Sequence, residues 1–433
     1  MKKLVCLLLA CVLMVGLCAC NGGGDENKVT TFSVGYGRSK VTDDNTESLP
    51  LAGYGNTSER MSVGLWDYGY TTCVAITDAD NETALIYTND FVRSPDDWVA
   101  AWRKAVNEAT GVPEDKILFS ATHTHSMPDI GYGIGLGDDY GQYVLNAVVT
   151  AAKTAMADRA PAAAEIGNTQ VDNMNWVRVY KTDKDIWIGD NFDCPDAGSP
   201  VGHYSDSDKL LQVLRFNREG KDPIVMINWQ GHPTISSTGS TEARENKYLA
   251  SSDYIGAVRD YVEEETGALF AFYLSGSGNL NAYSRIQGEG FTKNHKEYGK
   301  ILGKKVVEVL DDMKETQTGD VKTKQLMYTG EGPTGQRTME LDAVAAGNVA
   351  FVTAPYEMFW ESANDIKTKS PYDMTFVLTL ANGQNGYMPI DEHFELSNAK
   401  YPNSYEVRQC KFVRGTAEKL VDEFVGMLNE LKG

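Results

Sequence analysis

Residues 117–126 read ILFSATHTHS, so an apolar run leads directly into two histidines separated by one residue. The first half of the segment is typical of a buried strand. The chain has only 6 histidines among its 433 residues, and two of them, His123 and His125, lie in this segment. In extended backbone, residues two apart point to the same face, so both imidazoles can reach one point. Such a pair is a common start of a zinc site, because Zn2+ prefers imidazole nitrogen and needs converging ligands.

Outward from this segment, strand-like runs alternate with helical stretches. This pattern predicts an α/β fold, a single large layered domain with a mostly parallel or mixed central sheet flanked by helices. Ser94 is expected to cap the first helix and Gly111 to end it. The predicted helices cover residues 94–110, 139–159, 252–266, 294–314, 358–369 and most of 403–431. The predicted strands are residues 117–121, 164–167, 223–229, 269–275, 349–353 and 375–380, with a hairpin over 74–87.

Polar or glycine-rich turns follow five of the predicted strands. Ligands of such sheets gather beyond the carboxyl ends of the strands, so these turns are expected to form one site. His232 follows the strand 223–229 and is the natural third metal ligand. The other turns are 123–125 with both histidines, 276–281 (GSGNLN), 354–357 (APYE) and 382–387 (NGQNGY).

The remaining histidines are expected at the surface rather than at a metal. His203 falls in a polar loop, His295 begins a helix and His393 lies in an acidic loop. Glu357, between a strand and a helix, is either a ligand or a carboxylate that complements the helix dipole. Tyr387, taken alone, is a buried loop aromatic.

Two other metal-binding families also begin their sites with His-x-His, and neither fits. A metallo-β-lactamase requires Asp-His directly after the pair, whereas this chain continues with residues 126–128, SMP. An amidohydrolase barrel carries the pair on its first strand and needs several later histidines.

The N-terminal residues have the pattern of a targeting segment. Residues 1–20 are expected to be a lipoprotein signal peptide, with two lysines before an apolar run that is too short to span a bilayer. Its end, LCAC at 17–20, resembles a bacterial lipobox, in which Cys20 is lipidated; an ordinary secretory signal is the alternative. Residues 21–30 are expected to be a flexible tether and 31–433 the catalytic domain. Either signal places the mature protein outside the cytoplasm, and lipidation would anchor it to the cell membrane.

Charge and cysteine content limit the partners. The formal net charge of −20 would repel phosphate backbones, which argues against nucleic acid as a partner. Cys73, Cys194 and Cys410 are too widely spaced for a disulfide framework or a cysteine-rich zinc site, and their odd number leaves at least one buried free thiol. The sequence does not indicate an oligomeric state.

The motifs together resemble one family, the neutral (non-lysosomal) ceramidases. Residues 120–126, SATHTHS, resemble the family signature, which continues with Gly-Pro where this chain has Met127-Pro128. The similarity covers nearly all of 31–433 in the same order. Further resemblances are found at 51–55 (LAGYG), 228–234 (NWQGHPT), 251–256 (SSDYIG), 354–359 (APYEMF), 385–389 (NGYMP) and 404–406 (SYE).

The resemblance implies a zinc-dependent hydrolase that cleaves an N-acyl amide bond of a ceramide-like lipid. It implies that one Zn2+ is held by four ligands and that water attacks the amide. By the same resemblance His125 faces the scissile amide and passes a proton to the amine, while Tyr405 positions the amide. The implied zinc ligands are His123, His232, Glu357 and Tyr387.

Two departures from the family pattern concern the reacting centre. The family has a serine in its Gly-Asn-Leu-Ser turn, where this chain has Asn281. Asparagine can donate to an oxyanion but cannot act as a nucleophile, which favours attack by water. A family arginine near the amide has no clean counterpart, and Arg178 is the nearest candidate.

Two other functions remain open. An extracytoplasmic lipoprotein could bind a ligand in the same pocket without turnover, and an amidase could act on a non-sphingoid N-acyl compound. Ceramide requires a deep apolar groove, so the polarity of the pocket discriminates between substrates.

Overall fold

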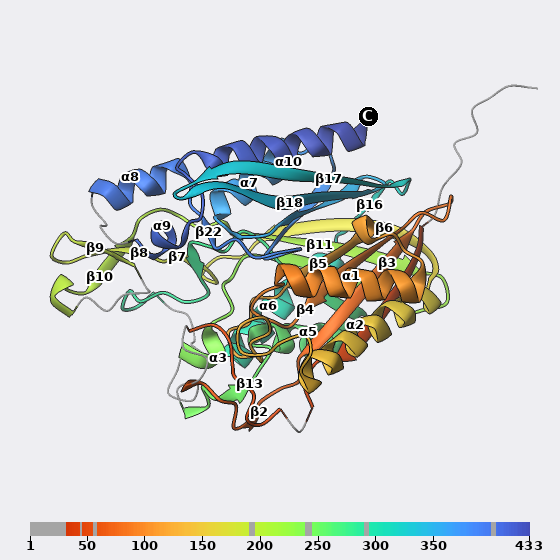
Figure 1. Cartoon of the computed structure of the whole chain (residues 1–433), viewed down its shortest axis with the longest axis horizontal. Helices are drawn as coiled ribbons and strands as arrows, with labels where there is room; N and C mark the ends of the chain where they lie inside the picture. The colour runs from red at the N-terminus through yellow and green to blue at the C-terminus, as the bar shows by residue number, and fades with distance from the viewer. Residues whose placement is uncertain are drawn as a thin grey trace, which may run out of the picture.

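Two β-sheets pack face to face at the centre of the molecule, and helices cover the outer face of each (Figure 1). The computed structural model describes residues 32–43, 46–54, 59–189, 195–238, 245–289, 294–399 and 404–433. The layers run helix, sheet, sheet, helix. The predicted α/β class with a mixed central sheet and flanking helices is confirmed, with a second sheet added.

The larger sheet has nine strands, and both of its edge pairs are parallel. Its order is β14-β12-β11-β6-β1-β3-β4-β5, with β16 pairing off this path to β6. β4 and β5 form one parallel pair, and β12 and β14 form the other. All remaining pairs are antiparallel, so of the two predicted arrangements, mostly parallel or mixed, the sheet has the mixed one. The strands are β1 (Phe32–Lys40), β3 (Tyr70–Thr77), β4 (Thr83–Asn89), β5 (Ile117–Ala121), β6 (Ala160–Gln170), β11 (Leu210–Arg218), β12 (Ile224–Trp229), β14 (Leu269–Leu274) and β16 (Lys314–Thr316).

The smaller sheet has four strands in the order β17-β18-β19-β21. Two of them form a long hairpin that the sequence did not predict, and β19 and β21 form a parallel pair. Its strands are β17 (Val321–Gly332), β18 (Gly335–Ala346), β19 (Val349–Ala354) and β21 (Met374–Thr379). Short strands complete the fold: β2 (Gly64–Leu65), β7 (Trp176–Val177), β8 (Val179–Thr182), β9 (Trp187–Gly189), β10 (Pro200–His203), β13 (Leu249–Ala250), β15 (Leu280–Asn281), β20 (Glu357–Met358) and β22 (Tyr387–Met388).

The helices cover the outer faces of the sheets through their apolar sides. The helices α1 and α2, and α5 and α6, lie on the large sheet, whereas α7 and α10 lie on the small one (Figure 1). The helices are α1 (Asp96–Thr110), α2 (Asp139–Ala157), α3 (Ile235–Thr238), α5 (Tyr254–Thr266), α6 (His295–Leu310), α7 (Trp360–Lys369), α8 (Asp391–Ala399), α9 (Tyr405–Gln409) and α10 (Thr416–Lys432).

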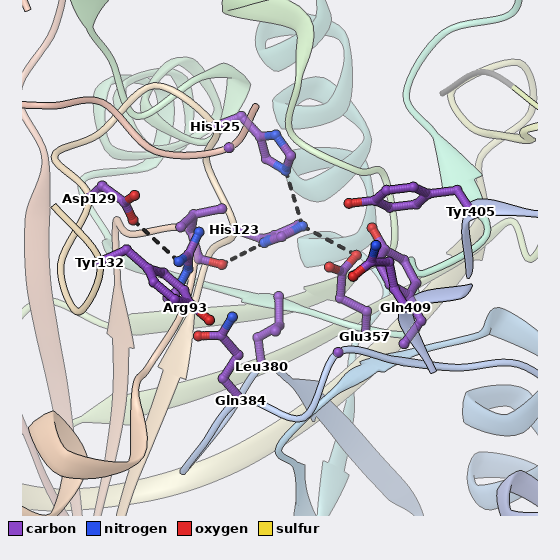
Figure 2. A pocket seen from close by; sticks show the side chains of 14 residues that line it. Arg93, His123, His125, Asp129, Tyr132, Glu357, Leu380, Gln384, Tyr405 and Gln409 are labelled. Carbon is purple, nitrogen blue, oxygen red and sulfur yellow. Dashed lines mark hydrogen bonds and ion pairs between the residues drawn. The ribbon is translucent and has the colours of Figure 1, made fainter. Parts of the chain in front are cut away.

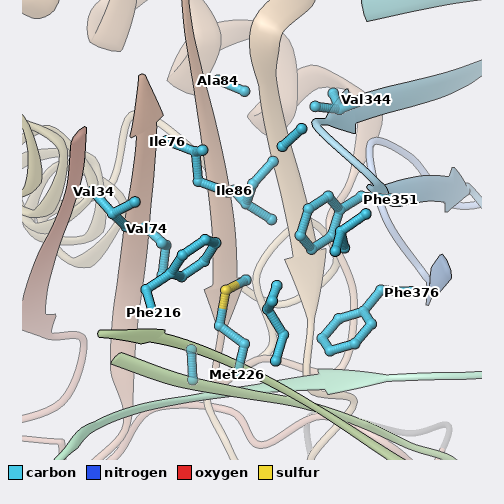
Figure 3. Close-up of a cluster of buried hydrophobic side chains, with 14 of the residues drawn as sticks. Val34, Val74, Ile76, Ala84, Ile86, Phe216, Met226, Val344, Phe351 and Phe376 are labelled. Carbon is cyan, nitrogen blue, oxygen red and sulfur yellow. The ribbon is translucent and has the colours of Figure 1, made fainter. Parts of the chain in front are cut away.

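The central core lies between the two sheets. Figure 3 shows Val74 and Ile86 of the large sheet facing Phe351 and Phe376 of the small one. Both faces of the inner strands are therefore apolar, which explains why their sequences read as continuous hydrophobic runs rather than alternating ones.

The two edges of the large sheet approach each other. Tyr273 of β14 donates its hydroxyl to the carbonyl of Ile86 on β4 at 3.1 Å, and Tyr36 of β1 donates to Phe270 on β14 at 2.8 Å. The sheet therefore bends round. As a result, the carboxyl ends of its two parallel edge pairs, which are far apart in strand order, lie near each other.

Two buried asparagines join β21 and the turn that follows it to these edges. The Asn228 amide donates to the carbonyls of Tyr273 and Val377, at 3.0 Å each, and accepts from the Val377 amide at 3.2 Å. On the other side, the Asn382 side chain accepts from the Phe119 amide at 2.8 Å and donates to Asp342 at 2.7 Å. The strand β21 is thus held between β12 and β5, the strands that precede the histidine motifs.

Several predicted boundaries need correction. Pro95, not Ser94, is the N-cap of α1, and no side chain caps that helix, although Gly111 ends it as expected. The predicted helix 294–314 ends at Leu310, and its last residue begins a strand, β16. The helix predicted at 358–369 is α7, which begins two residues later than predicted, at Trp360, because residues 357–358 form the short strand β20. The predicted helix over 403–431 is divided into α9 and α10, because Gly415 adopts a left-handed conformation before α10.

Some expectations fall on residues outside the described ranges: the signal peptide with Cys20, the tether 21–30, Gly55 and Cys194. Cys73 is a buried free thiol, as expected, and Cys410 is also free. Among the helices of the described residues, none combines the length and apolarity needed to cross a bilayer.

The asparagine that joins β5 to the small sheet gives a stability prediction. Asn382 has φ +57°, which glycine also adopts, so Asn382→Gly removes the amide and keeps the backbone. It leaves the Phe119 amide and the Asp342 carboxylate short of a partner inside the protein. We expect the free energy of unfolding to fall by about 2–4 kcal/mol. Asn173, exposed and at φ +58°, is the matched control. Equal losses in Asn382→Gly and Asn173→Gly, measured by urea unfolding, would contradict this role.

Candidate metal centre

His123 lies in the turn after β5 and is held rigidly. Its φ of +67° is uncommon for a residue with a side chain. Its Nδ1 lies 2.6 Å from the carbonyl oxygen of Val92, and its backbone amide donates to Phe91 at 2.9 Å. Because a carbonyl only accepts, Nδ1 carries the proton and the Nε2 lone pair is free. Fixing the tautomer through the other ring nitrogen is typical of a metal-bound histidine.

His232 follows β12 and is arranged in the same way. Its Nδ1 lies 3.2 Å from the carbonyl oxygen of Ser277, in the turn after β14. The imidazole is 1% exposed. Its Nε2 lone pair therefore points toward the other histidines. The orientation of the ring depends on two turns, its own after β12 and that of Ser277 after β14.

His125 brings a third imidazole nitrogen to the same point. Its Nε2 is 3.2 Å from Nε2 of His123 and 3.2 Å from Nε2 of His232. The three rings meet at steep angles, with centroids 4.5 to 5.1 Å apart. The predicted convergence is confirmed, but its geometry is not that of a strand, because His123 turns out of the extended conformation.

These nitrogens fit a metal ion. Two ligands of a tetrahedral zinc with bonds of about 2.0–2.1 Å are about 3.3 Å apart, close to the observed separations. Burial, followed by the neighbouring imidazoles, holds the pKa of His125 and of His232 well below the usual value. Both are neutral at pH 7, so protons cannot satisfy all three facing nitrogens. A cation would satisfy them, and the described residues of this group could hold one.

Glu357 and Tyr387 lie beside the histidines. Glu357 Oε2 is 3.5 Å from Nε2 of His123 and is buried without a hydrogen-bond partner. Glu357 and Tyr387 are register partners in the parallel pair β20–β22. Burial, and next the charge of Glu357, raises the pKa of the Tyr387 phenol well above its usual value. The phenol is therefore neutral unless a cation binds beside it.

A buried ion pair supports the tyrosines. Arg178 donates from Nε to Glu406 at 2.9 Å, and its guanidinium lies 5.4 Å from the centre of the Tyr387 ring. His393 and Ser404 lie against the same carboxylate, at 3.7 and 3.0 Å from its Oε2. Tyr405 begins α9 next to Glu406, and its ring lies 5.4 Å from that of Tyr387.

Residues 52–54 and Arg60 pack against His125. A Cβ built on Gly53 would lie 2.6 Å from the His125 ring, so only glycine fits there. Arg60 donates to the His125 carbonyl at 3.2 and 3.3 Å and also to that of Ala52. The Tyr54 ring packs edge-on to His125, with centroids 5.1 Å apart.

A pocket of about 520 Å³ opens onto this cluster (Figure 2). Of the predicted site residues, His123, His125, Glu357, Tyr387 and Tyr405 line it. His232, almost fully buried, completes the cluster without lining the pocket. Its other lining residues are Gly53, Val92, Arg93, Asp129, Tyr132, Leu380, Gln384, Gly386 and Gln409.

Asn281 does not line this pocket. It lies in β15, 3% exposed, and pairs with Trp176 of β7. Its predicted role at an oxyanion stays a prediction, as do the separate roles of His125 and Tyr405.

The expectation that the other histidines are surface residues was wrong for two of them. His295 is 2% exposed beneath Trp66, and His393 is 5% exposed against Phe359. His203 is half-buried at the end of β10. Their partners come from distant parts of the chain, so their local sequence gave no sign of burial. Among the described residues, none of the three joins the histidine cluster.

The sequence did not identify Arg60, Arg93 or Asp129 as site residues. Arg60 reaches the site from a loop, and Arg93 is the residue after Val92, which anchors His123. No spacing or motif marks these positions, and only the fold brings them to the pocket. Arg178, in the Asn-Trp-Val-Arg segment 175–178, became a candidate only through the family resemblance, as the nearest counterpart of an arginine near the amide.

Comparison with known proteins supports the fold. No protein-family model and no curated protein matches the sequence. Among solved structures, neutral ceramidase from Pseudomonas aeruginosa is similar, with a TM-score of 0.74, 15% identity, and coverage of 93% of this chain and 74% of that one. A ceramidase complexed with C2 is similar too, with a TM-score of 0.75, 15% identity, and coverage of 93% and 75%. The resemblance to neutral ceramidases is therefore confirmed for the fold.

The ion pair beneath the tyrosines predicts a pH dependence of stability. Burial alone would raise the pKa of Glu406, but the charge of Arg178 and the hydrogen bond of His393 outweigh it and lower this pKa from 4.5 to about 2. The carboxylate therefore stabilises the fold above pH 4.5, and this contribution is lost as the pH falls to about 2. Between these pH values the free energy of unfolding of the native protein should fall by up to about 3 kcal/mol more than that of Glu406→Gln.

Chemical denaturation across this pH range tests the prediction, with Glu108→Gln, exposed on α1, as the matched control. A pH profile of Glu406→Gln parallel to that of the native protein would show that Glu406 does not carry this dependence.

Proposed function

We propose that the chain is a zinc-dependent hydrolase that cleaves the N-acyl amide bond of a lipid-like substrate. One observation carries the proposal: three imidazole nitrogens and a buried carboxylate oxygen without a hydrogen-bond partner meet beside a pocket. The shared fold with a neutral ceramidase supports it.

The ligands we propose are His123, His232, Glu357 and Tyr387. The donor set of nitrogen and oxygen suits zinc, and both histidines have their second nitrogen fixed by a carbonyl. Zinc in such a site supplies Lewis acidity and a water that is deprotonated near neutral pH. Arg178 would keep the Tyr387 ring in place and favour its anionic form, because its charge opposes the effect of burial on the phenol.

The residues of the chain have distinct tasks in the reaction. The oxygen of water adds to the carbonyl carbon, the C–N bond breaks, and the amine leaves with a proton. His125 is neutral at pH 7 and faces the cluster, so it can take a proton from water and pass it to the nitrogen. Tyr405, at the pocket wall, would orient the amide. Because Asn281 offers no hydroxyl, we propose no covalent intermediate.

We also propose that the protein is an extracytoplasmic lipoprotein anchored through Cys20. The support is the lysine-led apolar run and the LCAC segment of residues 1–20. An anchor would hold the pocket near substrates dissolved in the membrane.

Metal content tests the central assignment. In protein lacking residues 1–20, we expect about one zinc per chain, lost in both His123→Ala and His232→Ala, because each removes a nitrogen ligand from a buried site. His203→Ala, a histidine outside the cluster, is the matched control and should keep the metal. A native protein that takes up no zinc, even when zinc is supplied, would overturn the hydrolase mechanism and favour a binding lipoprotein.

The same measurement on His125→Ala separates its two possible tasks. If His125 moves the proton, the variant keeps its zinc and loses turnover of N-acyl amides. If it is instead a third nitrogen ligand, as its 3.2 Å distances allow, the zinc is lost as well, and our assignment of His125 is wrong.

A further inference from the structure

The walls of the pocket are polar. Of its 14 lining residues, only Val92 and Leu380 are aliphatic. An alkyl chain gains about 0.8 kcal/mol for each buried methylene, and this gain requires apolar walls. The pocket therefore favours a polar group on the substrate close to the amide.

Arg93 is part of this polar surface. It directly follows Val92, whose carbonyl accepts the hydrogen bond of His123. The backbone position of Arg93 is therefore fixed relative to the histidine cluster. Its side chain is 14% exposed and lies 4.4 Å from the centre of the Tyr132 ring. In Figure 2, Arg93, Tyr132 and Gln384 lie on one side of His123. Glu357, Tyr405 and Gln409 lie on the other.

The guanidinium has donors to spare. Its one ion-pair partner among the described residues is Asp129, with Nη1 to Oδ1 at 3.4 Å. A charge-assisted hydrogen bond is shorter, about 2.7–2.9 Å, and arginine has five N–H donors in a planar fork. Asp129 Oδ1 is itself buried without a hydrogen bond. Arg93 is therefore only loosely neutralised and can bind a second carboxylate.

The charge around the pocket favours an anion. Arg60, Arg93 and Arg178 balance the three carboxylates Asp129, Glu357 and Glu406. A divalent cation beside Glu357 would make this region positive, in a chain whose formal net charge is −20. A local positive potential attracts and orients an anionic substrate.

We infer that the substrate is an N-acylated amino acid, an amide whose amine half carries a carboxylate, and that Arg93 binds this carboxylate. This inference rests on the proposed hydrolase function. Arginine suits the task because its fork matches the two oxygens of a carboxylate. The guanidinium lies over the Tyr132 ring, a cation–π contact that favours its position beside the pocket.

Two substrates that differ only at this group provide the test. N-octanoylglycine and N-octanoylethanolamine share the acyl chain and differ in a carboxylate against a hydroxymethyl group. In the full-length zinc protein, we expect kcat/KM to favour the glycine conjugate by at least about tenfold. Arg93→Gln should remove this preference, mainly through KM. Arg93→Lys should keep part of it, because the charge remains and the fork is lost. Arg337→Gln, exposed on β18, is the matched control and should keep the full preference.

Folding and metal loading are checked separately. Arg93→Gln leaves Asp129 unpaired, so the double variant Arg93→Gln/Asp129→Asn removes both charges together. Zinc content and thermal unfolding show whether each variant is intact. Calorimetric binding of both compounds to the metal-free full-length protein gives a second readout, in which Arg93→Gln should weaken only the glycine conjugate, by about tenfold or more.

The outcomes distinguish the two proposals. If native protein hydrolyses and binds both compounds equally, the inference on Arg93 is overturned while the hydrolase function stands. If nothing is hydrolysed but Arg93→Gln still binds the glycine conjugate more weakly than the native protein does, the carboxylate site stands and the hydrolase function fails. Binding that Arg93→Gln leaves unaltered would refute the inference whatever the activity.

Discussion

The structure depends on the side-chain amides that attach β21 to both ends of the large sheet. Asn228 of β12 binds the strand itself, and Asn382, in the turn directly after it, binds β5; both lie inside the protein, where a lost hydrogen bond is costly. An open sheet with this strand order would keep β5 and β12 far apart. With β21 between them, the turns that carry His123 and His232 meet. The same strand leads into the segment that ends at Tyr387, so one set of contacts positions three candidate ligands.

Backbone carbonyls and loop conformations orient most of the side chains of the site. Val92 and Ser277 each accept a hydrogen bond from one histidine and leave its other nitrogen free. The left-handed backbone of His123 and the bare Cα of Gly53 allow a third ring to reach the same point. Uncommon backbone and buried polar atoms without partners cost stability, and they persist where function requires them. Here they coincide at a place where a cation would satisfy them.

Local sequence patterns were sufficient for part of this result. The strands 117–121 and 223–229 are short apolar runs, and the turns after them correctly indicated His123 and His232 as neighbours. Glu357 and Tyr387 came from the resemblance to neutral ceramidases. The second sheet was not predicted, because β17 alternates exposed and half-buried residues and contributes few residues to the core.

What the sequence could not give are contacts between distant residues. Arg178 and Glu406 are 228 positions apart, and Arg60 and His125 are 65 apart. The burial of His295 and His393 has the same origin, since their packing partners come from other elements. The polarity of the pocket, on which the choice of substrate depends, also emerges only when six separate segments of the chain meet.

X-ray absorption at the zinc edge of the loaded protein tests the central claim most directly. The account predicts a shell of nitrogen and oxygen at about 2.0–2.1 Å, with outer scattering from at least two imidazoles and no sulfur. A spectrum with sulfur ligands, or one without imidazole scattering, would contradict it.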